Sequence, residues 1–443
     1  MIVDFIKQLG YNVIDTEIYS FIDTWKSWYK GQNDFHKYTQ YNGKKRVSRK
    51  RATLGMAKRI CEDWANLLLN EKAEIAMANE NTAKQLKSIL DDNNFRMQSN
   101  RLVELVFALG TGAFVEYKNG NSVAIDYISA DMIYPISSHN GIITECAFGS
   151  EKIINGKKCI YLNLHVLENG KYKIINKLFE KESRAAVPLP SDVAEEYNTG
   201  RAKPLFQIIT PNAINSVNLS SCMGSSIFAN CIDVLKGVDL VYDSYLNEYK
   251  LGKKRIIIPV GMAQIMDSDG APKPVFDYDD VEFYAVPNNN SITDLKEIDM
   301  HIRAQEHTEG LQQNLNVLSD KVGLGTDRYT YGIQGLKTAT EVISEKSDMY
   351  QNMCKHQIVL RTALINLAKS VLYLVGTNID NEEIRVDFDD SIIHDTDSEK
   401  KTDLQLVTSG IMPAWEFRMK WNNETEAQAK KMVMTELDGN DDL

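Results

Sequence analysis

The sequence predicts an α+β fold, and three observations lead to this prediction. Residues 338–374 contain neither Pro nor Gly and are rich in helix-forming residues, which predicts one long helix. Residues 113–179 alternate apolar and polar side chains between Asn-Gly turns, the pattern of antiparallel strands joined by hairpins. Between these regions, two segments with apolar residues at helical spacing flank a short strand-containing module of residues 252–298.

Composition sets broad limits on the class of protein. The chain of 443 residues is long enough for two or more domains with buried cores. Its hydrophobic content of 43% and charged content of 25% are typical of a folded protein. The net charge of −11 argues against a generally basic, nucleic-acid-binding surface but leaves room for local basic patches.

The cysteines and the apolar runs indicate the environment. Six scattered cysteines form no Cys-x-x-Cys pair, and the N-terminus lacks the pattern of a secretory signal. We therefore expect reduced thiols in a cytosolic environment. The most apolar run, residues 358–375, is interrupted by Arg361 and Lys369, so we expect no membrane span.

Helices are predicted first along the chain. Apolar residues recur at helical spacing in residues 15–29, 56–70, 81–91 and 96–109. A basic segment lies between the first two helices and contains Lys44, Lys45, Arg46, Arg49, Lys50, Arg51, Lys58 and Arg59. It is either a solvated helix start or a patch for an acidic partner, which could be protein or nucleic acid.

The two glycines of Gly110-Thr111-Gly112 raise the question of a phosphate-binding loop, because paired glycines can cradle a phosphate. That fingerprint requires the order strand, glycines, helix, whereas here a helix precedes the glycines and a strand follows them. Gly110 is therefore predicted to be a left-handed helix C-cap. The strands that follow should turn at Asn-Gly pairs 119–120, 140–141 and 169–170, with a loop at 187–204 and another strand at 205–210.

The next region is predicted to be a helix, a small β module and a returning helix. Residues 224–226 (Gly-Ser-Ser) should start the first helix, which runs to Lys250. Strands are expected at 256–260 and 281–286, with a turn-like segment at 261–280 between them. A second helix is expected at 300–322.

The loop of residues 323–336 holds four glycines and two tyrosines, and the long helix of 338–374 follows it. A capping box of Thr338 and Glu341 marks the helix start, and its length is roughly 55 Å. Its first half is polar and its second half apolar, so it should be buried at one end. Beyond it we expect a strand at 383–388, helical pieces at 404–435 broken at 410–413, and a disordered acidic tail at 436–443.

Catalytic and metal-binding motifs are largely missing from the sequence. It contains no P-loop, HExxH, GxSxG or zinc-ligand spacing. The best metal candidate is the acidic run with Asp389, Asp390, His394, Asp395 and Asp397, which is also the pattern of a solvated strand end. We therefore expect no cofactor, no metal and no enzymatic activity. The alternatives are a metal-dependent nucleic-acid enzyme using Asp389, Asp390 and Asp395, and a non-catalytic structural or adaptor protein.

The order of these segments resembles that of portal proteins of tailed phages that infect Gram-positive bacteria, in the SPP1-like group. The resemblance spans about residues 20–435. It rests on the order of four runs: GTGAFVEYKNG (110–120), GSSIFANCIDVLKGVDLVYDSYLNEYKLGKKRIIIP (224–259), HTEGLQQNLNVLSDKVGLGT (307–326) and TATEVISEKSDMYQNMCKHQ (338–357).

The resemblance implies a portal-protein fold with a wing, a two-helix stem, a small clip, a tunnel loop, a long channel helix and a short crown. The implied divisions are an N-terminal wing at 1–222, outgoing stem helix at 223–251, clip at 252–298, returning stem helix at 299–322, tunnel loop at 323–337, long channel helix at 338–375, and C-terminal wing strand with crown-like helices and acidic tail at 376–443.

The resemblance also implies the function and the partners. Portal proteins form dodecameric rings at the unique capsid vertex, through which double-stranded DNA is packaged and ejected without sequence specificity. By resemblance, this chain would dock the large terminase and later the head-tail adaptor. It would nucleate procapsids with scaffolding protein and the major capsid protein in the host cytoplasm, without contact with a membrane. An acidic protein around DNA should also repel it and so limit adhesion.

Three groups of residues are implied to carry this function. The tunnel loop group would contact DNA or neighbouring loops and comprises Lys321, Arg328, Tyr329, Tyr331 and Lys337. The clip group would dock terminase and adaptor and comprises Lys253, Lys254, Arg255, Asp277, Asp279 and Asp280. The stem group would pack between subunits and comprises Ile232, Leu235, Val238, Tyr242, Tyr245, Leu311, Leu315 and Leu318.

Overall fold

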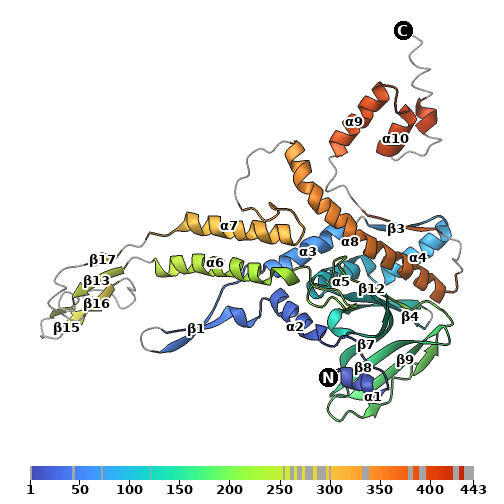
Figure 1. The fold of residues 1–443 in the computed structure, drawn as a ribbon, viewed down its shortest axis with the longest axis horizontal. Helices are drawn as coiled ribbons and strands as arrows, with labels where there is room; N and C mark the ends of the chain where they lie inside the picture. The colour runs from blue at the N-terminus through green and yellow to red at the C-terminus, as the bar shows by residue number, and fades with distance from the viewer. Residues whose placement is uncertain are drawn as a thin grey trace, which may run out of the picture.

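The computed structural model has a broad body of helices and sheets from which a long pair of helices projects (Figure 1). It describes the chain except residues 1, 42–44, 71–72, 121, 253–254, 260–263, 267–271, 275–282, 287–295, 299–300, 332–338, 378–382, 389–395, 423–428 and 434–443. The side chains of 251, 255, 258–259, 264–266, 272–274, 283–286, 296–298, 339–347, 396–399 and 422 are likewise left undescribed. Helices and mainly antiparallel sheets are mixed as an α+β fold requires.

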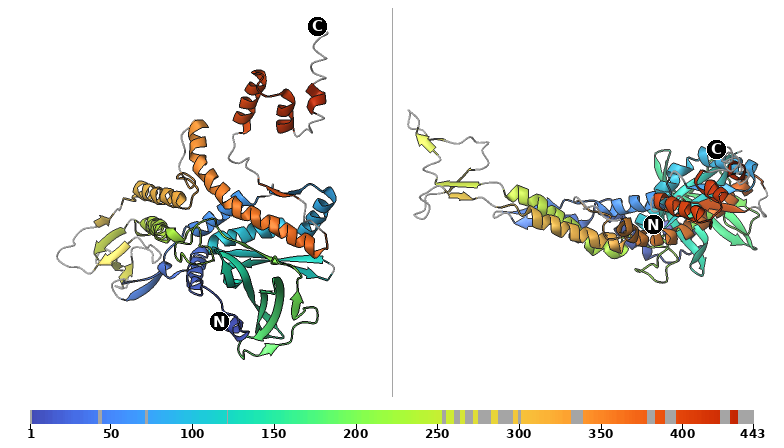
Figure 2. Two further views of the ribbon diagram at one scale, coloured as in Figure 1. Left: turned by 45° about the vertical axis from the view of Figure 1, so that its right-hand side comes forward. Right: turned by 90° about the horizontal axis from the view of Figure 1, so that it is seen from above.

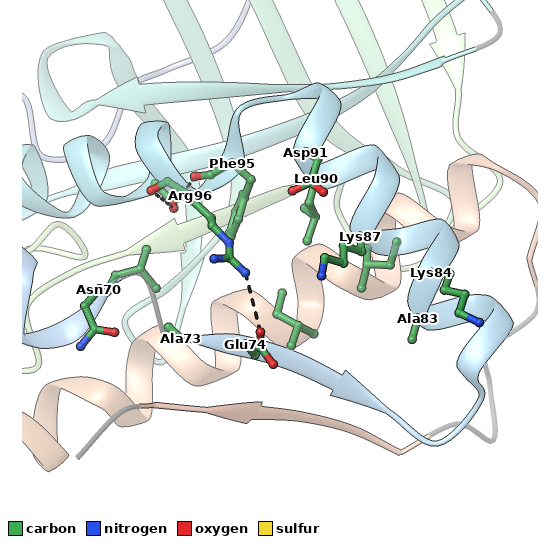
Figure 3. Close-up of a pocket in the computed structure, with 14 residues that line it drawn as sticks. Asn70, Ala73, Glu74, Ala83, Lys84, Lys87, Leu90, Asp91, Phe95 and Arg96 are labelled. Carbon is green, nitrogen blue, oxygen red and sulfur yellow. Dashed lines mark hydrogen bonds and ion pairs between the residues drawn. The ribbon is translucent and has the colours of Figure 1, made fainter. Parts of the chain in front are cut away.

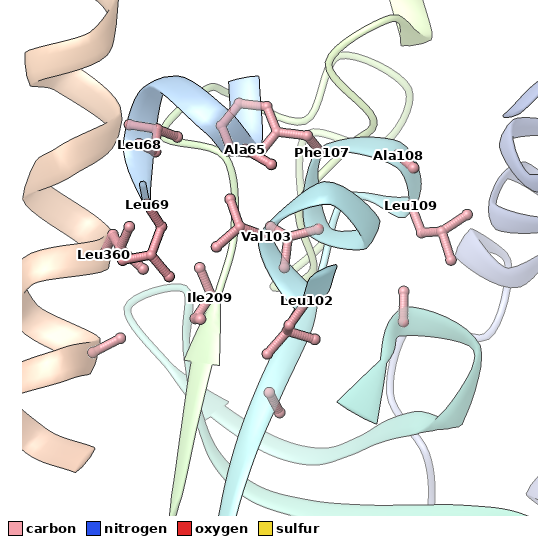
Figure 4. Packing of buried hydrophobic residues seen from close by; sticks show 14 of the residues in the cluster. Ala65, Leu68, Leu69, Leu102, Val103, Phe107, Ala108, Leu109, Ile209 and Leu360 are labelled. Atoms are coloured by element: carbon pink, nitrogen blue, oxygen red, sulfur yellow. The ribbon is translucent and has the colours of Figure 1, made fainter. Parts of the chain in front are cut away.

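Five helices belong to the N-terminal part of the chain: α1 (Ile2–Gln8), α2 (Ile18–Tyr29), α3 (Met56–Leu68), α4 (Glu80–Asp92) and α5 (Phe95–Leu109). The four predicted helices are confirmed as α2 to α5, whereas α1 was not predicted and packs through Phe5 and Ile6 in a separate apolar cluster with the sheet described below. The apolar faces of α2 to α5 meet in the main core, in which Trp25 and Trp64 are fully buried. Figure 4 shows the packing of α3 and α5 against β12 and α8. Burial of such large aromatic side chains supplies much of the driving force for folding.

The basic segment divides between two elements, since Lys58 and Arg59 lie in the first turn of α3 as a helix start requires, whereas the residues before them do not. Residues Arg46–Lys50 form β2, which pairs with β1 (Lys37–Tyr41) as an antiparallel hairpin in register Lys37↔Lys50 to Tyr41↔Arg46. The tyrosines and threonine of β1 favour a strand, and pairing with β1 decides the conformation of the basic residues. A short turn of 3-10 helix, Asp34–His36, precedes the hairpin.

Two sheets form the other side of the body. One contains β12 (Phe206–Ile209), β4 (Gly112–Asn119) and β5 (Ser122–Ser129) in that order. The other contains β6 (Ile133–His139), β7 (Ile142–Ile154), β8 (Lys157–Glu168) and β9 (Lys171–Glu180) as a meander. At three of the turns, 140–141, 155–156 and 169–170, Asn and Gly both have positive φ, as the type I′ turn requires; the turn at 155–156 was not predicted.

The segment 187–204 is not purely a loop. β10 (Ala186–Val187) and β11 (Glu196–Asn198) both pair with β9. β9 ends the meander and therefore offers unpaired backbone groups, which these short segments satisfy. The strand predicted at 205–210 is confirmed as β12, and it pairs with β4 rather than with this meander.

Gly110 and Gly224 mark the closest approach of two distant segments. Gly110 caps α5 with φ +88, as predicted, and a Cβ on it would lie 2.5 Å from the Gly224 carbonyl oxygen. The Gly224 backbone is held here by the Thr111 hydroxyl at 3.0 Å. The prediction that residues 224–226 start a helix is therefore wrong, because this backbone packs on the end of α5 and the helix α6 (Ile232–Leu251) begins later, after a 3-10 turn at Ala229–Cys231.

The projecting pair consists of α6 and α7 (Ala304–Lys321), with a small β module at its far end (Figures 1 and 2). In this module β13 (Arg255–Pro259) pairs in parallel with β16 (Phe283–Val286) and antiparallel with β17 (Lys296–Ile298). The segment 261–280 contains strands as well as turns, because β14 (Gln264–Met266) pairs with β15 (Pro272–Pro274). This module and the returning helix agree with the predicted order.

The long helix is confirmed as α8 (Ala339–Leu374), which crosses the body of the protein. Its capping box lies outside the described residues. β18 (Ile384–Asp387) follows and pairs with β3 (Glu74–Met77), a strand that was not predicted. The last helices, α9 (Thr396–Thr408) and α10 (Ala414–Asn422), are separated at Gly410 with φ +75, as predicted.

Within the described residues, one stretch of α8 is long and apolar enough to cross a membrane by length and composition. This stretch is Asp348–Leu374, and 56% of its most apolar window is buried inside the protein. Leu360, Leu364 and Leu367 belong to the main core. Such burial is what a core helix of a globular protein also shows, so the feature is weak support for a membrane span.

Candidate functional site: the anchored loop at the base of the helix pair

The helices α6 and α7 lie against each other along their length. A Cβ on Gly237 would lie 2.7 Å from Asn314 Oδ1, and one on Gly310 would lie 3.9 Å from Val241. At the far end, Arg303 forms an ion pair with Glu248, and His307 Nε2 lies 3.4 Å from the same carboxylate. Small residues permit the close approach near the body, and charges join the helices near the β module.

The predicted stem residues divide into two classes. Leu235, Val238, Leu315 and Leu318 are at most 3% exposed and belong to the core of this one chain. They therefore leave no side-chain surface for a second copy, which corrects their expected role between subunits. Ile232, Tyr242, Tyr245 and Leu311 are partly buried. Among the described side chains of the pair, the large apolar residues that are exposed are Leu240, Tyr249 and Val317, at 47%, 47% and 49%. The helical spacing of apolar residues in the sequence includes Tyr249 but neither Leu240 nor Val317.

The loop that follows α7 is fixed at its start by α3 and α8. The indole Nε1 of Trp64 donates to the Val322 carbonyl oxygen at 3.1 Å, and Asn352 Nδ2 donates to the Gly323 carbonyl oxygen at 3.2 Å. Gly323 and Gly325 both have φ +80, which glycine adopts at little cost. The first two of the four glycines thus turn the chain sharply.

Asp63 is the centre of the loop anchor. Its side chain is 4% exposed and accepts from Arg328 at 3.1 Å and from the Tyr329 hydroxyl at 2.9 Å. Arg59, one helical turn earlier, lies 3.2 Å from the same carboxylate. Burial and the neighbouring Asp63 raise the pKa of Tyr329, so its hydroxyl remains a donor. Charge-assisted hydrogen bonds of this kind are stronger than neutral ones.

This anchor changes the interpretation of two predicted site residues. Tyr329 is 8% exposed, and the Arg328 side chain, 37% exposed, is committed to Asp63. In this conformation neither is a free loop residue pointing into open space. Release of the Asp63 pair is required before Arg328 can place its full charge on another group.

The remaining loop residues differ in their surroundings. Gln312 Oε1 accepts a hydrogen bond from the Tyr331 N–H at 3.3 Å, and Gln312 Nε2 donates one to the Tyr329 carbonyl oxygen at 3.0 Å. This side chain therefore holds the loop backbone at two points. The Tyr331 ring is 67% exposed. Lys321 Nζ lies 3.4 Å from the Asn230 carbonyl oxygen, and Lys337 lies outside the described residues.

The sequence did not indicate which residues position the loop. Asp63, Trp64 and Gln312 do so, but each is distant from the loop in the chain or lies within a helix of ordinary composition. The available signal was an acid, Asp63, on an otherwise apolar helical face beside Trp64. A buried acid on such a face requires a partner, yet the sequence does not say that the partner is 265 positions away.

His356 of α8 packs against Trp64, one of the residues that anchor the loop. This side chain is 7% exposed and stacks edge-on against Trp64 and Phe107, with ring centroids 4.8 Å and 5.0 Å away. Its Nδ1 accepts from the Asn212 N–H at 3.0 Å. Burial, assisted by Lys355, lowers the pKa of His356 from 6.5 to about 4.

Acid is expected to destabilise this part of the protein through His356. The unfolded chain binds a proton near pH 6.5 and the folded chain only near pH 4, so the free energy of unfolding falls as the pH drops through this window. The difference between the two pKa values corresponds to about 3 kcal/mol. When Tm is measured at pH values from 7 to 4, the decrease in Tm should be smaller for His356→Gln than for the unaltered protein. Equal losses would contradict this role; some loss remains because burial also lowers the pKa of His165, to about 3.

Other candidate sites are less developed. A pocket of 210 Å³ lies between α4, α5 and β3, and Glu74 and Arg96 form an ion pair of 3.7 Å in its lining (Figure 3). A hollow of 180 Å³ beside the loop is lined by Asp320, Gly323, Gly325, Asp348, Gln351 and Asn352. Among the described residues, no group of three or more His, Cys, Asp or Glu side chains is arranged to hold a metal ion.

Some predicted residues fall outside what the structure describes. Lys253, Lys254, Asp277, Asp279 and Asp280 lie outside the described residues, as do Asp389, Asp390, His394 and Asp395. For Arg255 the backbone is described, and it pairs with Ile298 of β17. The β module is therefore located by its strands, while its charged side chains remain predictions.

The described residues thus form a projecting helix pair, a loop anchored at its base and a long helix behind it. A family model described as phage portal protein, SPP1 Gp6-like, matches residues 11–435, and the chain belongs to this family. No curated protein matches the chain. The family is structural rather than enzymatic, and its members are head-tail connectors at the capsid vertex of the virion. The family assignment agrees with the resemblance found in the sequence.

Proposed function

We propose that copies of this chain form a dodecameric ring at the unique capsid vertex, with α6 and α7 as its stem and the β module as its clip. Family membership supports a portal function, and the ring and the DNA-packaging context belong to the family as a whole. The observation that carries the finer assignment is the order of elements in space. A helix leads out to a β module, a helix returns, and an anchored glycine loop and a long helix follow at the base.

The proposed division of labour follows this order. The β module, farthest from the body, would dock the large terminase during packaging and the head-tail adaptor afterwards. The body would contact scaffolding and major capsid proteins and so nucleate the procapsid. The loop after α7 would border the channel through which double-stranded DNA passes, with the phosphate backbone as its sequence-independent partner.

Ring formation is the first property to test. Negative-stain electron microscopy of the purified protein, with light scattering in parallel, should give rings with a central hole and masses that are multiples of 50.2 kDa. If the purified chain is monomeric, co-expression with scaffolding and coat protein is the decisive repeat. Monomers under both conditions would contradict the portal assignment and favour a non-catalytic adaptor.

Arg328→Glu is expected to leave rings intact and to reduce the number of DNA-filled heads at least tenfold. The new carboxylate would face Asp63, so an attraction between the loop and α3 would become a repulsion. The loop would also lose a cation that can bind a DNA phosphate. Counting filled and empty heads by cryo-electron microscopy measures the effect. Arg328→Lys keeps the charge and is the matched control. Normal filling in Arg328→Glu would remove the loop from the packaging channel.

A further inference from the structure

The hairpin of β1 and β2 is fixed to the helix pair at its base. Two acidic residues of α6 hold it. The Asp239 carboxylate accepts hydrogen bonds from the Thr53 hydroxyl at 3.0 Å and from the Leu54 N–H at 2.8 Å. The same carboxylate lies 2.8 Å from His36 Nε2. Asp243 accepts from the Ala52 N–H at 2.9 Å. Both carboxylates are buried. The hairpin is therefore held in a defined position relative to α6.

The hairpin and α7 occupy opposite faces of α6. Gly237 and Val241 approach α7, whereas Asp239 and Asp243 bind the base of the hairpin. Positions two residues apart on an α-helix are about 200° apart around its axis. Figure 1 and the left view of Figure 2 agree, with α6 between α7 and the hairpin.

The hairpin is basic and has little support of its own. Its described strands carry Lys37, Arg46, Arg49 and Lys50 and contain no acid, and Lys37 lies directly opposite Lys50. Like charges at facing positions destabilise a strand pair, and a two-stranded hairpin alone is marginal in water. Among the described residues, no acid forms an ion pair with Arg46, Arg49 or Lys50. An external acidic surface would remove this repulsion.

An acidic stripe runs along the exposed side of α7. Its members share one helical face by their spacing of three and four residues and are all exposed: Glu306, Glu309, Gln313, Val317 and Asp320. Within the part of the chain that the structure describes, no cation forms an ion pair with the three acids. Arg303, whose pKa is raised by Glu248 and to a smaller extent by Glu306, is ion-paired with Glu248.

We infer that the basic hairpin of one copy binds the acidic α7 stripe of the neighbouring copy. The inference rests on the proposed ring, in which every copy offers the hairpin to one neighbour and α7 to the other, a head-to-tail contact that closes by rotation. The lengths are comparable, since Arg46 to Lys50 spans about 14 Å of strand and Glu306 to Asp320 about 21 Å of helix. Tyr41, 65% exposed, and Val317, 49% exposed, add apolar surface that a phosphate backbone cannot complement.

Charge exchange between the two surfaces tests this contact. The hairpin variant Arg46→Glu, Arg49→Glu, Lys50→Glu and the stripe variant Glu306→Lys, Glu309→Lys, Asp320→Lys are each expected to give at least tenfold fewer rings. The measurement is mass photometry and electron microscopy under the conditions that give rings for the unaltered chain. Lys84→Glu, Lys87→Glu, Arg101→Glu on exposed positions of α4 and α5 is the charge-matched control and should assemble normally.

Two restorations identify the contact as one between copies. The chain carrying all six changes should form rings again, because the signs are exchanged on both surfaces. An equal mixture of the two single-surface variants should also form rings, in which the variants alternate. Thermal unfolding of each variant establishes that the fold is retained. The inference is overturned if the hairpin variant assembles normally or if neither combination restores rings.

The outcomes separate this inference from the proposed function. If the unaltered chain forms rings and the hairpin variant does so equally, the portal proposal stands and the inferred contact fails. If that variant forms rings but loses retention on a 50-base-pair DNA duplex at low salt, the hairpin is a nucleic-acid contact, and the copy-to-copy contact is likewise rejected. If the unaltered chain forms no rings even with scaffold and coat protein, both proposals fail together.

Discussion

Gly110→Ala is expected to lower the free energy of unfolding by about 2–5 kcal/mol. Its φ of +88 is unfavourable for alanine, which costs about 1–2 kcal/mol. The added Cβ would also lie 2.5 Å, 2.7 Å and 2.8 Å from backbone atoms of residues 224 and 225. Backbone atoms cannot rotate away as a side chain can, so the end of α5 and the segment before α6 must separate, at a cost of about 1–3 kcal/mol.

Chemical denaturation of the variant measures this loss, and Gly10→Ala is a closely matched control. Gly10 also has φ +88, but a Cβ on it would have nothing within 4 Å. The control therefore isolates the backbone term and should cost about 1–2 kcal/mol. Equal effects of the two substitutions would mean that the contact between Gly110 and Gly224 contributes nothing to stability. Because this contact joins the body to the base of α6, we also expect fewer rings from Gly110→Ala at physiological temperature.

Asp63→Ala is expected to release the loop and to lower the free energy of unfolding by about 1–3 kcal/mol, the cost of leaving a buried hydrogen-bond donor unsatisfied. The Arg328 side chain is 37% exposed and stays partly hydrated, so the larger loss is at the buried Tyr329 hydroxyl. Here Arg328 and the Tyr329 hydroxyl would both lose their acceptor. Hydrogen exchange of residues 323–331 should accelerate at least tenfold, and DNA-filled heads should decrease with it.

Arg59→Ala tests how much of the effect of Asp63→Ala comes from the ion pair of Arg59 and Asp63 within α3 and how much comes from the contacts of Asp63 with the loop. The Arg59 side chain is 57% exposed and contacts the same carboxylate, so its loss should cost less than about 1 kcal/mol. A double-mutant cycle of Asp63→Ala with Tyr329→Phe should give a coupling energy of about 1 kcal/mol or more. Additive effects, or unchanged exchange in the loop of Asp63→Ala, would show that Asp63 does not anchor it.

The anchored loop also bears on how a portal ring would respond to DNA. Arg328 is held by a partly exposed ion pair, which phosphate can compete for, whereas Tyr329 is buried and Gln312 clamps the backbone. A loop of this kind can exchange one charge partner without unfolding. The tyrosine and the glutamine would keep its position while Arg328 changes its partner.

Local pattern decided most of the secondary structure. The helices at α2 to α8 and the Asn-Gly hairpins follow from apolar spacing and turn chemistry, which act over a few residues. The C-cap at Gly110 was likewise predicted from the order of helix, glycine and strand. The order of elements also carried the family resemblance, because the outgoing helix, the module, the returning helix and the loop are contiguous in the chain.

Only the tertiary structure decided where the functional side chains lie. Pairing with β1 made residues Arg46–Lys50 of the basic segment a strand, and the contact with Gly110 moved the start of α6 away from residues 224–226. By resemblance, Arg328 was expected to contact DNA or neighbouring loops, and in this conformation Asp63 binds it from α3. These outcomes depend on contacts between segments more than a hundred residues apart or on backbone pairing with a neighbour. The sequence by itself therefore determined most of the elements, their order and the family, while long-range packing decided which charges are bound and which remain available to a partner.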